Sequence, residues 1–155
     1  MSRRRFGIVR AILTGGLIVG VLDLADAFIF FGLRGATLIR IPQGIAAGLI
    51  GRPAAISGGM RTAALGVALH FLNATLIVMI YVLASRVIPA LAKRPFLFGP
   101  LYGIVAYAVM TFVVVPLSAI HSTGFPATPA LVNGLLIHML GVGLPSALMA
   151  RAARS

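Results

Sequence analysis

Two long stretches of the chain contain no Lys, Arg, Asp or Glu. They run from residue 62 to 85 and from residue 95 to 150. A helix needs about 20 mostly apolar residues to cross the hydrocarbon core of a bilayer, so the first stretch suits one span and the second is long enough for two. A turn rich in Gly and Pro at residues 121–129 divides the second stretch. The chain is therefore expected to cross a membrane several times.

The predicted fold is all-α, a four-helix transmembrane bundle that makes a single integral membrane domain over residues 1–155. Spans are expected near 8–32, 63–87, 96–119 and 129–149, and the first of them contains both acidic residues of the chain. Charged residues make up 10% of the sequence, whereas soluble domains contain about 25%. This composition excludes an ordinary soluble domain, because too few polar residues are present to cover one.

The loop at residues 34–61 is expected to contain a further helix. Between Pro42 and Gly51, Ile45 and Leu49 fall on one helical face, and small or polar residues fall on the opposite face. This pattern predicts an interfacial or re-entrant helix near 42–51. An irregular loop packed on the bundle is the alternative.

Thirteen Lys and Arg residues outweigh two acidic residues, which gives a formal net charge of +11. Nine of the thirteen flank the spans on the side of the chain termini, and four lie in the first loop. Because basic residues are retained on the cytoplasmic side, this count predicts that both termini lie in the cytoplasm. The expected partners are the bilayer and its anionic headgroups at the cytoplasmic face, not nucleic acid, since the basic residues border apolar segments.

The N-terminal segment also resembles an export signal. Residues 2–6 read Ser-Arg-Arg-Arg-Phe, similar to a twin-arginine motif, and residues 25–27 imitate a small-residue cleavage site. The apolar stretch nevertheless continues through residues 28–31, as a spanning helix would. We therefore expect an uncleaved anchor, and a mature chain that begins at Phe28 is the alternative.

Each predicted span has one stripe of small and polar residues, and such stripes are expected to face one another in lipid. At about 1.5 Å per residue, polar groups from all four spans fall at similar depths, roughly 10–15 Å below the outer membrane boundary. The predicted polar site consists of Asp23, Asp26, His70, Asn73, Tyr107, Thr111 and His138. Arg34 and Arg40 of the first loop are candidate charge partners, because an ionised Asp in lipid is costly.

Three interpretations of this polar site remain open. In the first, the polar groups satisfy one another and fix the register of the helices. In the second, the Asp pair changes protonation in a proton- or solute-linked transport component, which would need an oligomer because four spans give a narrow path. In the third, His70 and His138 bind a haem or a divalent metal. The first two require no cofactor, and an accessory-subunit role is a further alternative.

No enzyme is predicted. The chain contains no Cys, which removes thiol catalysis and thiolate metal ligands. It also contains no Gly-rich phosphate loop, no Ser nucleophile elbow and no metalloprotease helix motif.

The second half of the chain resembles small bacterial inner-membrane proteins of the YagU-like type. The matching features are His70-Phe71 in a span that ends near Ile88-Pro89, Gly103 early in the next span, and His138 before a basic tail; Pro116-Leu117 closes the third span. The resemblance implies a bacterial multi-pass protein and implies no activity. The Asp pair lies outside the matching part.

Overall fold

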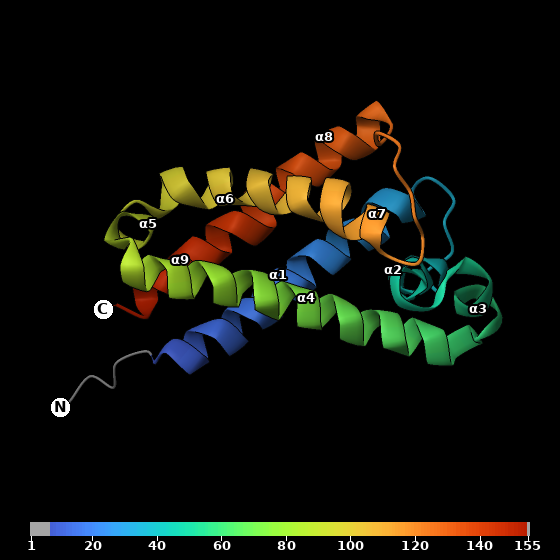
Figure 1. The fold of residues 1–155 in the computed structure, drawn as a ribbon, viewed down its shortest axis with the longest axis horizontal. Coiled ribbons are helices and arrows are strands. Elements are labelled where there is room, and N and C mark those ends of the chain that lie inside the picture. Colours follow the sequence, from blue (N-terminus) through green and yellow to red (C-terminus); the bar gives the residue numbers. More distant parts are fainter. Residues whose placement is uncertain (1–6, 155) are drawn as a thin grey trace.

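A computed structural model describes residues 7–154, and all four apolar stretches form long helices in it (Figure 1). Within this part of the chain, four helices are long and apolar enough to cross a membrane. Their bounds are Ile8–Gly32, Gly59–Val87, Pro95–Leu117 and Thr128–Ala152. The prediction of an all-α, four-helix bundle is confirmed, and the chain has the helices of a multi-pass membrane protein.

The first two long helices are regular, and the last two are interrupted. Helices α1 and α4 are continuous α-helices, at Ile8–Gly32 and Gly59–Val87. The third long helix contains five π-helical residues, and the fourth contains six. The third long helix consists of α6 (Pro95–Val109), η1 (Met110–Val114) and α7 (Val115–Leu117). The fourth consists of α8 (Thr128–Ile137), η2 (His138–Gly143) and α9 (Leu144–Ala152). Such wide turns frequently occur at functional sites.

Three short helices connect the long ones. Helix α2 (Arg40–Ile50) confirms the helix predicted near 42–51, whereas α3 (Arg52–Ser57) and α5 (Pro89–Lys93) were not predicted. A positive φ of 78° at Gly51 permits the sharp turn between α2 and α3. The buried amide of Gln43 donates hydrogen bonds to the carbonyl oxygens of Gly59 at 3.1 Å and Ile56 at 3.5 Å. These contacts hold α2 and α3 against the start of α4.

The larger apolar cluster lies at one end of the bundle, opposite a smaller one of Ala46, Ala47 and Ala55 in α2 and α3. The start of α1 and the end of α9 lie together at this end, and α2 and α3 cover the opposite end (Figure 1). Val78, Tyr81 and Val82 of α4 are buried there against Val19 and Val142. Because the larger cluster occupies the terminal end, the space between the helices opens toward α2 and the connection at residues 118–127.

Close backbone contacts join the helices through glycines. A Cβ at Gly103 would meet the backbone of His138 and Met139, so α6 lies directly against η2. A Cβ at Gly66 would meet the carbonyl of Pro42, so α2 lies directly against α4. Small residues at helix contacts are the usual means by which membrane helices approach closely.

The outer surface of the bundle is apolar. Leu17 of α1 is 59% exposed, and Leu72 and Ile80 of α4 are also exposed. Surfaces of this kind are covered by lipid in a membrane protein. The twin-arginine-like residues 2–6 lie outside the described residues, and residues 25–27 lie within α1, which continues to Gly32.

Candidate functional site

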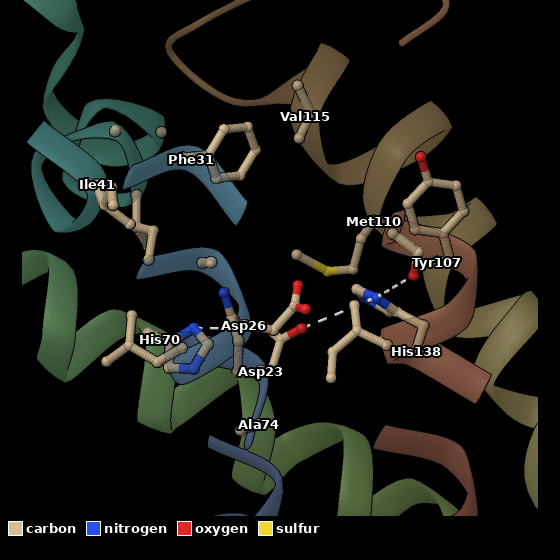
Figure 2. Close-up of a pocket in the computed structure, with 18 of the residues that line it drawn as sticks. Asp23, Asp26, Phe31, Ile41, His70, Ala74, Tyr107, Met110, Val115 and His138 are labelled. Atoms are coloured by element: carbon tan, nitrogen blue, oxygen red, sulfur yellow. Dashed lines mark hydrogen bonds and ion pairs between the residues drawn. The ribbon is translucent and has the colours of Figure 1, made fainter. Parts of the chain in front are cut away.

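A cavity of about 760 Å³ lies between the long helices in the half of the bundle covered by α2. Apolar side chains form most of its wall, and the face of α2 that carries Ile41, Ile45 and Leu49 borders it. Polar groups gather at one place in this wall (Figure 2). They come from α1, α4, α8 and η2, and they comprise Asp23, Asp26, His70, Asn73, Asn133 and His138.

Asp23 lies between two imidazoles that come from different helices (Figure 2). The Nδ1 atom of His70 is 3.9 Å from Oδ2 of Asp23, and Nδ1 of His138 is 3.9 Å from Oδ1. The side chains of the two histidines are 11% and 15% exposed, against 26% for Asp23. At these distances Asp23 forms ion pairs with the rings when they are protonated, but the contacts are too long for hydrogen bonds.

The hydrogen bonds of His70 fix which nitrogen carries a proton. Nε2 of His70 donates to the carbonyl oxygen of Gly20 at 2.9 Å, because a carbonyl can only accept. In a neutral ring, Nδ1 is then unprotonated and faces Asp23. A carboxylate opposite that lone pair is unfavourable, whereas a doubly protonated ring would direct an N–H toward it.

His138 is oriented differently. Its Nδ1 atom donates to the carbonyl oxygen of Gly134 at 2.9 Å and also faces Asp23. The ring packs edge-on against Tyr107, with centroids 5.2 Å apart. A Cβ at Gly134 would meet the Tyr107 ring, so the glycine makes room for this aromatic contact. In neutral His138 the N–H at Nδ1 is therefore directed to the Gly134 carbonyl, with Asp23 close beside this hydrogen bond.

Asp26 has a separate partner, Asn133, which sequence reasoning missed. Nδ2 of Asn133 donates to Oδ2 of Asp26 at 2.6 Å and links α8 to α1. The signal was available, because Asn73 and Asn133 are the only asparagines in the chain and both line the cavity. The predicted stripe of the fourth span contained His138, and Asn133 lies outside that stripe on the same span.

The structure brings most of the predicted polar residues together, with one exception. Asp23, Asp26, His70, Asn73, Tyr107 and His138 all line the cavity. Thr111 is half-buried and does not line it, whereas Met110 and Val114 do. Thr111 lies within η1, where the wider turn changes the direction of the side chains that an ideal α-helix would give.

The two arginines considered as charge partners bond elsewhere. Nη1 of Arg34 donates to the carbonyl oxygen of Phe30 at 2.9 Å, and the guanidinium lies over the Phe30 ring at 3.6 Å. Arg40 borders the cavity, but its Nη1 atom donates to Oε1 of Gln43 at 3.4 Å. Neither pairing was anticipated, because both depend on local helix geometry.

His70 and His138 are the residues that would hold a metal or haem. In the part of the chain that the structure describes, no group of three or more His, Asp or Glu side chains is arranged to hold a metal ion. The Nδ1 atoms of both rings face Asp23, and Nε2 of His70 is bonded to Gly20. A bis-imidazole centre would require the rings to face a common iron, and here both face a carboxylate.

Comparison with known proteins finds no matching family model, no matching curated protein and no matching solved structure. The resemblance of the second half of the chain to YagU-like proteins therefore stays a prediction.

Proposed function

We propose that this chain is a multi-pass protein of a bacterial inner membrane, with both termini in the cytoplasm, that takes part in proton- or solute-linked transport. In this proposal the cavity binds a solute, and Asp23 exchanges a proton as the solute binds. A homo-oligomer would complete the path across the membrane, because four spans alone enclose little space. The single observation that carries the proposal is the placement of Asp23 between two imidazoles at the cavity wall.

The purely structural interpretation fits Asp26 better than Asp23. Asp26 accepts a short hydrogen bond from Asn133, as a helix clamp requires. Within residues 7–154, Asp23 accepts no hydrogen bond, and its side chain remains 26% exposed beside the cavity. A carboxylate that has no hydrogen-bond donor in an apolar setting makes folding less favourable. A side chain that is retained despite this cost is expected to serve the function of the protein.

The orientation in the membrane rests on the basic residues. Arg154 donates to the carbonyl oxygen of Arg86 at 3.2 Å, so the ends of α4 and α9 meet on one side. Lys93 ends α5, and Arg94 lies between α5 and α6, at the same end of the bundle. Basic residues gathered at this end support a cytoplasmic location for it and contacts with anionic headgroups.

Infrared spectroscopy of the purified protein tests the proton exchange. The chain has only two acidic side chains, so few carboxyl groups contribute to the carbonyl band of protonated acids. We expect acidification to raise this band by about one carboxyl group and alkali to remove it, because in this proposal Asp23 takes up and releases a proton beside the cavity. Asp23→Asn should abolish the titrating band.

Asp26→Asn is the matched control, because an asparagine at this position can still accept from Asn133 through its amide oxygen. This variant should retain the titrating band. A band that is the same at acid and alkaline pH, or one that disappears only in Asp26→Asn, would favour the structural clamp and contradict the proposal.

A further inference from the structure

The cavity is the one acidic place in a strongly basic protein. The chain has two acidic side chains against thirteen basic ones, and both acids line the cavity. Of the described basic residues, Arg40 alone borders it, and its guanidinium bonds to Gln43. With neutral histidines, the polar part of the wall therefore attracts positive charge.

The remainder of the wall selects against a small hydrated cation. It is formed mainly by aliphatic side chains, with the rings of Phe31 and Tyr107 among them. No metal-holding group exists among residues 7–154. Removing water from an inorganic ion in such surroundings is costly, whereas an organic cation with an apolar body gains from burial and from contact with aromatic faces. The volume of about 760 Å³ lies within the usual range of small-molecule sites.

We infer that the cavity binds lipophilic organic cations, with the positive charge beside Asp23 and the apolar body against α2 and the aromatic wall. This inference rests on the proposed function and names its substrate class. The cation takes the place of the proton on Asp23, and that proton passes to water. Two groups face Asp23 and bias this exchange, His70 and His138. Three further groups line the same cavity, Asp26, Tyr107 and Arg40.

Two probes of similar shape and opposite charge test the inference. We would measure binding of tetraphenylphosphonium and of tetraphenylborate to the purified full chain by equilibrium dialysis. We expect tetraphenylphosphonium to bind at least about tenfold more tightly than the borate at alkaline pH, because it meets a carboxylate at close range in an apolar site. Acid should weaken its binding, since protons occupy Asp23 and the histidines become positive, and binding near neutral pH should release protons.

Three variants separate the effect of charge from the effect of volume. Asp23→Asn should weaken binding of the cation at least about tenfold at alkaline pH and reduce its dependence on pH to the part that the histidines contribute. Gly44→Phe should block binding, because Gly44 lines the cavity and a Cβ there meets nothing within 4 Å. Gly32→Phe is its control, since a Cβ at Gly32 also meets nothing but the residue does not line the cavity.

The outcomes separate the substrate class from the proton exchange. Equal binding of both probes, or cation binding that survives Asp23→Asn, would overturn the inference. If the infrared band of Asp23 titrates under those conditions, the proposed function stands without this substrate class. Cation binding that depends on Asp23 but not on pH, with no proton release, would instead refute the proposed proton exchange. The inferred cation site would then stand without it. Tighter binding of the borate, lost on Arg40→Gln, would assign the cavity to anions and contradict the inference.

Discussion

Replacing Gly103 with leucine is expected to break the contact between the third and fourth long helices and to destabilise the protein. A Cβ at this position would meet the carbonyl of His138 and the Cα of Met139. Both are backbone atoms of a helix and cannot rotate away as a side chain can. Overpacking a close contact costs about 1–3 kcal/mol and occasionally more, and we expect a loss above about 3 kcal/mol because whole helices must separate.

Circular dichroism during detergent-induced unfolding measures this effect, and it suits a chain without tryptophan. Gly32→Leu is the control, since a Cβ at Gly32 meets nothing within 4 Å. It should unfold like the unmodified protein. A Gly103→Leu variant as stable as Gly32→Leu would mean that α6 does not lie directly against η2.

Replacing Asn133 with leucine is expected to destabilise the protein by about 2–3 kcal/mol, because it leaves Asp26 without its donor. The Asn133 amide is 2.6 Å from the Asp26 carboxylate, and it joins two helices that are distant in the sequence. A charged acceptor that loses its partner in an apolar setting carries the full cost of its burial.

The double variant Asp26→Leu with Asn133→Leu separates this cost from packing. Replacing both partners by apolar groups removes the unpaired carboxylate, so most of the stability should return. Unfolding free energies of the two single variants and the double variant give the coupling. Losses that simply add would show that Asp26 and Asn133 do not interact, and would count against the clamp between α1 and α8.

The fold was largely predictable because lipid imposes a simple requirement on sequence. Stretches without charge must form helices that satisfy their own backbone groups, so the spans agree with the structure to within a few residues. The start of the second span was wrong by four residues, at Gly59 in place of residue 63. The uncharged stretch begins only after Arg61, whereas the helix continues through Arg61 to Gly59, where the Gln43 side chain of α2 bonds to the start of α4.

The site was predictable in composition but not in pairing. Scarce polar residues in apolar spans pointed to Asp23, His70 and His138, and the structure brings them together. Sequence periodicity assumes a constant turn, so it misplaced Thr111 within the π-helical segment η1. It also could not assign Asn133 to Asp26, which lies 107 residues away in the sequence. That contact depends on how α1 and α8 are rotated against each other.

Accessibility of the cavity to water can be measured with single cysteines, because the chain has none of its own. Leu72 and Asn73 are neighbours at the same depth on α4, but Asn73 lines the cavity and Leu72 is exposed on the apolar outer surface. A thiol reacts as the thiolate, which an apolar lipid environment suppresses.

A positively charged, water-soluble methanethiosulfonate applied to the protein in membranes should therefore modify Asn73→Cys at least about tenfold faster than Leu72→Cys. Tetraphenylphosphonium should slow the reaction at Asn73→Cys alone. Faster modification of Leu72→Cys, or no modification of Asn73→Cys, would contradict a water-accessible polar cavity between these helices.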